Sequence, residues 1–201
     1  MLTLEEGTSL VRLARRSIER YLIDGKIPED RTSNPKLMRK SGVFVTLYKY
    51  PGKMLRGCIG FPYPVYPLWE ATKRAAISAA VEDPRFYPLT LDELPDIIIE
   101  VSVLTTPERI DDLAENRSEI PKLIKIGIHG LIVKRGIFSG LLLPQVATEF
   151  GFNEEIFLDE TCRKAGLEPG CWKSEDTEIY RFEAEIFEET KPLGEVIRIG
   201  N

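Results

Sequence analysis

The chain has 201 residues, a formal net charge of −5 and hydrophobic side chains at 43% of its positions. This length can bury one good core, so we expect a single domain over residues 1–190 and a loose tail over 191–201. The isoelectric point near 5.2 argues against a broad nucleic-acid surface, because nucleic-acid-binding domains are usually basic. No apolar run approaches the roughly 20 residues of a membrane helix, which argues against a membrane protein.

The cysteine content predicts a reducing, cytoplasmic location. There are three cysteines, Cys58, Cys162 and Cys171, and the N-terminal region is charged and lacks an apolar signal segment. We therefore expect three free thiols and no disulfide. The cysteines lack the short spacing of zinc sites, and a single histidine cannot complete a ligand set, so we expect no metal and no other cofactor.

Periodicity and turn residues predict helices and strands that alternate along the chain. Helices are expected over residues 3–24, 68–82, 144–151 and 153–164, and strands over 43–50, 54–61, 97–104, 128–135, 137–143 and 178–187. Most of these strands form hairpins, with helices between them. The order predicts an α+β fold in which a largely antiparallel sheet, built from hairpins, is flanked by helices.

The most informative segment is the hexapeptide Leu-Arg-Gly-Cys-Ile-Gly at residues 55–60. Strict alternation along a strand would put Arg56 and Cys58 on one face. Gly57 and Gly60 weaken a strand and indicate that something approaches its backbone closely. We expect this strand to lie beside residues 97–104 or 128–135.

Arg56 and Cys58 each have competing interpretations. Arg56 either forms a buried ion pair, most obviously with Glu100, or binds an anion or phosphate group. Cys58 is a small buried apolar side chain, a nucleophile whose thiol Arg56 activates, or a non-covalent contact in a pocket.

His129 and Gln145 are the other candidates. His129 lies between Gly127 and Gly130, and it is either a hydrogen-bonded structural residue or a catalytic or ligand-orienting one. Gln145 follows a proline at a predicted helix start, where pockets often form. If these segments converge, His129 and Gln145 line one cleft with Arg56 and Cys58.

Four segments, in this order, resemble the AMMECR family: residues 55–60, 83–89 (Asp-Pro-Arg-Phe-Tyr-Pro-Leu), 127–131 (Gly-Ile-His-Gly-Leu) and 143–147 (Leu-Pro-Gln-Val-Ala). The resemblance covers roughly residues 5–187, and the compact length is similar to that of archaeal members. It implies a single α+β domain, often with a larger and a smaller lobe. Some members carry Glu at the position of Gln145, which weakens a general-base role there.

The resemblance implies no established reaction. It implies Memo-like and radical S-adenosylmethionine proteins as partners, and a small or nucleotide-like substrate. Two functions stay open at this point. The protein is an enzyme or enzyme component that acts on such a substrate in a cleft around the hexapeptide, with Cys58 and His129 as catalytic residues and Arg56, Gly57, Gly60, Glu100 and Gln145 as ligand-binding residues. Alternatively, it is a non-catalytic binding module or adaptor for a partner protein.

Overall fold

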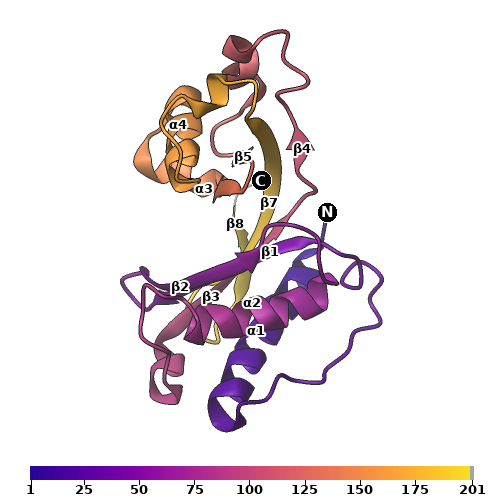
Figure 1. Ribbon diagram of the computed structural model, residues 1–201. Coiled ribbons are helices and arrows are strands. Elements are labelled where there is room, and N and C mark those ends of the chain that lie inside the picture. The colour runs from indigo at the N-terminus through magenta and orange to yellow at the C-terminus, as the bar shows by residue number, and fades with distance from the viewer. Residues whose placement is uncertain (200–201) are drawn as a thin grey trace. The chain divides into compact units, whose positions relative to one another are not determined.

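The computed structural model describes residues 1–199. The chain forms two compact units, which we describe separately (Figure 1). Unit 1 comprises residues 1–104 and the C-terminal segment from Glu185 onward, and unit 2 comprises Thr105–Ala184. The α+β fold with an antiparallel sheet and flanking helices is confirmed.

Unit 1 contains two helices on one face of an antiparallel sheet. Its elements are α1 (Leu4–Asp24), β1 (Gly42–Lys49), β2 (Met54–Phe61), α2 (Leu68–Val81), the 3-10 helix η1 (Leu91–Asp96), β3 (Ile97–Leu104), the end of β7 (Glu178–Glu189) and β8 (Val196–Ile199). The strand order is β2-β1-β3-β7, with β8 also paired to β7. Because β1 lies between β2 and β3, the expectation that the hexapeptide strand lies beside residues 97–104 or 128–135 is wrong.

Local sequence explains the helices of unit 1. Thr3 and Glu6 form a capping box at the start of α1, and Gly25 ends that helix with a φ of 72°. The buried stripe of α1 packs with the alanines of α2 against β1 and β3. Its arginines are engaged: Arg12 and Arg15 both pair with Glu189.

The C-terminal segment differs from the prediction. Residues 196–199 form β8, which pairs antiparallel with residues 186–189 of β7. The expectation of a loose tail over 191–201 is therefore wrong for these residues, while 200–201 lie outside the described part of the chain. The short β-branched run Val196-Ile197 carries the signal, but its length makes it hard to recognise.

In unit 2 the antiparallel sheet packs against short helices. Its elements are β4 (Glu108–Arg109), η2 (Arg117–Leu123), β5 (His129–Arg135), β6 (Phe138–Leu142), α3 (Pro144–Phe150), α4 (Glu154–Lys164), η3 (Cys171–Lys173) and the first part of β7. The strand order is β6-β5-β7, and β4 also pairs with β7. The hairpin of β5 and β6 is the one predicted around Gly136.

A disulfide joins Cys162 of α4 to Cys171 of η3. The expectation of three free thiols is therefore wrong, and Cys58 is the free cysteine. The two cysteines are nine positions apart in sequence. They meet because the chain reverses at Gly166 and Gly170, which both adopt positive φ. That reversal returns η3 to the side of α4, which spacing alone does not reveal.

Candidate functional site

The hexapeptide lies on β2, the edge strand of unit 1. The pairing with β1 shifts along the strand: Tyr48 lies opposite Leu55, and Leu47 lies opposite Gly57. Arg56 is therefore the extra residue of a β-bulge. A bulge interrupts the regular alternation of side chains, so the strict pattern assumed from the sequence fails at Arg56.

This bulge separates the two polar side chains of the hexapeptide. Thr46 of β1 lies opposite both Cys58 on β2 and Glu100 on β3. Cys58 and Glu100 consequently share a face of the sheet, opposite to the face on which Gly57 approaches α2. The prediction that Arg56 and Cys58 share one face is wrong, because the bulge removes Arg56 from that register.

Arg56 is held by η1 and by the chain that precedes it. Its side chain is buried, and its guanidinium binds both carboxylate oxygens of Glu93, with Nε–Oε1 and Nη2–Oε2 distances of 3.2 and 3.0 Å. Nη1 also donates to the carbonyl oxygen of Tyr87 at 3.0 Å. The Arg56 hydrogen bonds lower the pKa of Glu93. Arg56 thus has the carboxylate partner that the sequence predicted, but this partner is Glu93 and not Glu100.

Cys58 lies in an environment where burial dominates the titration of its thiol. The Thr46 hydroxyl lies 3.3 Å from Sγ. Burial raises the pKa of the Cys58 thiol, and the hydrogen bond with Thr46 and attraction from Arg85 only partly oppose this effect. Since the thiolate is the reactive form, this environment disfavours Cys58 as a nucleophile.

Asp83 and Arg85 cap the open edge of β2. Asp83 accepts the backbone N–H of Cys58 at 2.9 Å, and Arg85 donates to the Cys58 carbonyl oxygen at 3.3 Å. The Arg85 guanidinium also binds both Asp83 oxygens, at 3.0 and 2.7 Å. These bonds from Arg85 hold the pKa of Asp83 at about 2. The segment 83–89 therefore protects the edge strand, whose free N–H and C=O groups would otherwise be exposed.

Glu100 is buried and lies close to another buried acid, Glu188. The Ser102 hydroxyl lies 3.3 Å from its carboxylate, and Glu188 is close enough to repel it. Glu188 in turn pairs with Lys53 at 2.8 Å. Burial first, and then repulsion from Glu188, raise the pKa of Glu100 to about 7. Glu100 therefore keeps its proton to a higher pH than an ordinary glutamate.

The two glycines of the hexapeptide lie so close to neighbouring main chain that neither position has room for a side chain. A Cβ atom at Gly57 would lie 2.1 Å from the carbonyl oxygen of Ala79 in α2, and one at Gly60 would lie 2.3 Å from that of Val43. These contacts are to the protein's own main chain. They account for both glycines without a ligand, so their ligand-binding role stays a prediction.

A groove of about 870 Å³ lies between the start of β2 and segment 84–93. Its lining residues are Lys49, Met54, Leu55, Arg56, Pro84, Arg85, Phe86, Tyr87, Pro88, Thr90 and Glu93. The Phe86 ring lies against both Arg56 and Arg85, at 5.9 and 5.5 Å from their guanidinium carbons. The hexapeptide and segment 83–89 together therefore build one rigid, open groove.

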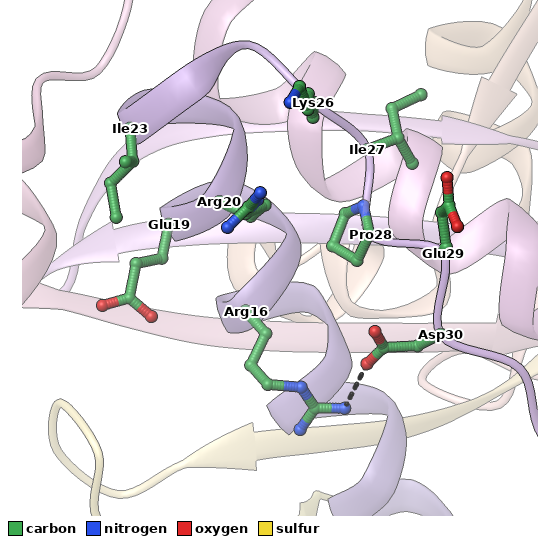
Figure 2. Close-up of a pocket in the computed structure, with 9 residues that line it drawn as sticks. All are labelled: Arg16, Glu19, Arg20, Ile23, Lys26, Ile27, Pro28, Glu29 and Asp30. Carbon is green, nitrogen blue, oxygen red and sulfur yellow. Dashed lines mark hydrogen bonds and ion pairs between the residues drawn. The ribbon is translucent and has the colours of Figure 1, made fainter.

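A second hollow, of about 610 Å³, lies beside the end of α1 (Figure 2). Figure 2 shows Arg16 reaching toward Asp30, and their closest atoms are 3.4 Å apart. The lining carries three cations and three carboxylates: Arg16, Arg20, Lys26, Glu19, Glu29 and Asp30. The balance of charge gives this hollow no preference for a ligand of either sign.

His129 and Gln145 lie in unit 2. The Nδ1 atom of His129 accepts the backbone N–H of Lys125 at 3.1 Å, which places the proton of the neutral ring on Nε2. Nε2 lies 4.0 Å from Glu183, and burial lowers the pKa of His129. Gln145 lies in the first turn of α3, and its buried Oε1 has no hydrogen-bond partner among the described residues.

The candidate residues thus fall into two sets. Arg56 and Cys58 belong to unit 1, and His129 and Gln145 belong to unit 2. Each set is defined within its own unit, and the shared cleft stays a prediction.

Sequence reasoning did not assign a site role to Asp83, Arg85, Tyr87 or Glu93. Glu93 forms a capping box with Thr90, whose N–H it accepts at 3.1 Å, and such a cap can be read from local spacing. The same carboxylate also binds Arg56, which local spacing could not reveal.

Two further properties bear on function. Within residues 1–199, no helix is both long and apolar enough to cross a membrane. Over the same residues, no group of three or more His, Cys, Asp and Glu side chains is placed to hold a metal ion.

Comparison with known proteins identifies the family of this chain. The AMMECR1 family profile matches residues 11–187. The chain therefore belongs to the AMMECR1 family. The motif segments that form the β2 edge and its groove all lie inside the matched range.

Archaeal proteins are similar over nearly the whole chain. Protein PH0010 of Pyrococcus horikoshii is 57% identical over 198 residues, which cover 96% of this chain and 95% of that protein. Protein MK0488 of Methanopyrus kandleri is 56% identical over 196 residues, covering 97% and 94%. The crystal structure of the uncharacterized protein PH0010 aligns with a TM-score of 0.91 and 56% identity over 97% of each chain.

Proposed function

We propose that the protein is a non-catalytic binding module that presents the groove beside β2 to a partner protein. The observation that carries this proposal is that the polar residues of the motif segments bind one another: Arg56 binds Glu93, and Asp83 binds Arg85. Arg56 and Asp83 are buried and bonded on several sides, while Met54, Arg85 and Tyr87 face solvent around them. A scaffold that fixes its own polar groups and exposes its rim is suited to recognition.

The state of Cys58 also favours binding over catalysis. A nucleophilic cysteine needs a lowered pKa and an adjacent base. Here burial raises the pKa of the thiol, and its hydrogen-bonding neighbour is the Thr46 hydroxyl. The motif therefore stabilises a surface more readily than it supplies a reacting atom.

An enzymatic role is the second candidate, and one observation favours it. The raised pKa of Glu100 suits a general acid. Thr46 lies opposite both Glu100 and Cys58, so these two side chains are on the same face of the sheet. In this version a small or nucleotide-like substrate is bound and Cys58 contacts it. Glu100→Gln and Cys58→Ser would then abolish turnover, whereas the binding module would keep its partner in both variants.

The partners implied by the family resemblance provide the first test. Purified Memo-like and radical S-adenosylmethionine proteins from the same host would be titrated against the full chain. We expect one of them to bind, and Tyr87→Ala to weaken binding about tenfold or more, as for an interface hot spot. Ile137→Ala is the matched control, because Ile137 of unit 2 is 94% exposed and Tyr87 is 91% exposed.

The same titrations can also contradict the proposed docking site. Equal loss of affinity in Tyr87→Ala and Ile137→Ala, or binding that neither change affects, contradicts the groove as the docking site. We also propose a cytoplasmic location. The Cys162–Cys171 disulfide removes the cysteine content as an argument for it, so fractionation of the native host is the test: recovery with the cytosolic proteins supports this location, and recovery outside them contradicts it.

A further inference from the structure

Large apolar side chains are exposed on the rim of the β2 groove. Tyr87 is 91% exposed, Met54 is 64% exposed and Leu55 is 39% exposed. Tyrosine, methionine and arginine are the residue types enriched at protein interfaces, and the exposed Arg85 lies among these three. An occupant that covers this rim must therefore offer an apolar side chain of its own.

The accessible charge of the groove is positive although the chain as a whole is negative. The side chains of Lys49 and Arg85 are 46% and 51% exposed. The one carboxylate in the lining, Glu93, is 31% exposed; it binds Arg56, and the Lys49 ammonium lies 3.7 Å from it. One carboxylate thus faces the three cations of the lining, Lys49, Arg56 and Arg85. Asp83 offsets part of the Arg85 charge, but its side chain is only 2% exposed and it faces the β2 edge.

The sign of this charge contrasts with the rest of the molecule. The chain carries a net charge of −5, and the other acids of η1, Asp92 and Asp96, do not line the groove. A local cationic site on an acidic protein attracts acidic groups and repels basic ones. The positive charge of the groove therefore adds a second requirement: the occupant should carry acidic groups as well as an apolar side chain.

The groove is also rigid before anything binds. Arg56, Asp83 and Glu93 fix its floor through paired hydrogen bonds, and the Phe86 ring lies 5.9 and 5.5 Å from the guanidinium carbons of Arg56 and Arg85. A preformed surface loses little entropy on binding, so a short flexible segment can bind to it. Its open form suits an extended chain more than a small molecule, which is usually enclosed on most sides.

From these observations we infer that the occupant of the β2 groove is an acidic peptide segment of a partner protein, with a large apolar side chain beside its carboxylates. The apolar side chain packs against Tyr87 and Met54, and the carboxylates face Lys49 and Arg85. This inference rests on the proposed function and adds the chemistry of the partner.

Selection from a display library of random short peptides, with the full-length protein immobilised, tests this inference. We expect the enriched peptides to combine Asp or Glu with Phe, Leu or Trp. A synthetic copy of an enriched peptide, followed by fluorescence anisotropy, should bind more weakly as NaCl is raised. Tyr87→Ala should weaken it about tenfold or more, and Lys49→Gln by a smaller factor.

Two matched variants serve as controls. Ile137→Ala removes an equally exposed apolar side chain from unit 2, and Lys26→Gln removes an exposed cation near the end of α1. Neither should change the affinity. All of these positions are exposed, so loss of folding does not complicate the comparison, and circular dichroism of each variant verifies this.

The possible failures are distinguishable. Enriched peptides that are neutral or basic, or binding that Tyr87→Ala weakens but salt and Lys49→Gln do not, overturn the acidic segment and leave the binding module intact. Peptides whose affinity is the same in all variants, or no enrichment at all, overturn the inference. If AMP or ATP shifts NMR signals of Lys49 and Tyr87 while no peptide does, the partner-protein function fails as well.

Discussion

The edge of β2 in unit 1 and the turn around Trp172 in unit 2 show two ways of fixing a loop to a regular element. At β2, ionisable side chains hold the loop: Asp83 and Arg85 bind the Cys58 backbone. At the turn, a covalent bond joins Cys171 to α4. Hydrogen bonds from Gly170 and Trp172 to Asp159 strengthen that attachment.

The difference shows where recognition is expected. The turn in unit 2 buries its anchor, since Cys171 and Trp172 are 5% and 2% exposed. The β2 edge buries its anchors but leaves Arg85 and Tyr87 at the surface. A loop held by charged groups can expose part of them to a ligand, whereas a disulfide offers nothing to bind. The comparison therefore locates the candidate site at β2.

The largest effect is expected from Gly57→Ala, which would break the contact beneath the β2 edge. The added Cβ would lie 2.1 Å from the Ala79 carbonyl oxygen. Because main chain cannot shift as a side chain does, we expect a loss of about 3 kcal/mol in the free energy of unfolding. Urea denaturation measures it. Gly52→Ala, at an open turn position, is the control and should cost far less.

Reduction of the disulfide should have the next largest effect, and it should act on unit 2. In the loop-entropy model, a disulfide between cysteines nine positions apart raises the free energy of the unfolded chain by about 2.5 kcal/mol and so stabilises the folded state. Chemical denaturation with and without a phosphine reductant measures this loss. A double variant with Cys162→Ser and Cys171→Ser should be insensitive to the reductant. Equal stability of the reduced and oxidised wild type would show that the bridge is not an anchor.

Acid should weaken the β2 edge and spare the covalent turn. The pKa of Asp83 is lowered to about 2 from an ordinary value of 3.8. The stability it contributes is therefore present above about pH 4 and is lost as the pH falls toward 2. Asp83→Asn should cost about 2 kcal/mol at pH 7, because charged hydrogen bonds are lost. The variant should differ less from wild type at pH 2.5.

The smallest effect concerns Glu100, whose pKa is raised to about 7 from 4.5. The folded protein holds a proton that the unfolded chain releases, so wild-type stability falls between about pH 4.5 and pH 7 and is level above that range. Glu100→Gln carries no such group and should gain about 1 kcal/mol over wild type between pH 6.3 and pH 8. A pH-independent difference between the two proteins would contradict a protonated Glu100.

The sequence predicted the elements whose signals are local. The hairpin of β1 and β2, the capping box of α1 and the helix from Glu154 to Lys164 all follow from spacing within one segment. The hexapeptide was also recognisable as a strand. What it could not show was the bulge at Arg56, because a bulge depends on the register with a partner strand.

The missed contacts all join segments that are distant in sequence. Glu93 lies 37 positions from Arg56, and Asp83 lies 25 positions from Cys58. Glu100 was the expected partner because it interrupts an apolar strand. It occupies the face opposite Gly57, where Glu188 and Lys53 interact with it. Residue type predicted that Arg56 needs a carboxylate, but only the fold determines which one.

The reactivity of Cys58 tests the central claim most directly, because Cys58 is the free thiol while the other two cysteines are bonded. Its reaction rate with an aromatic disulfide reagent would be followed against pH in the native, unreduced protein and in urea. We predict a slower rate in the native protein and a midpoint shifted to higher pH, since burial raises the pKa of the thiol. A native rate faster than that of the unfolded chain, with a midpoint at lower pH, would reveal an activated nucleophile and contradict the binding-module account.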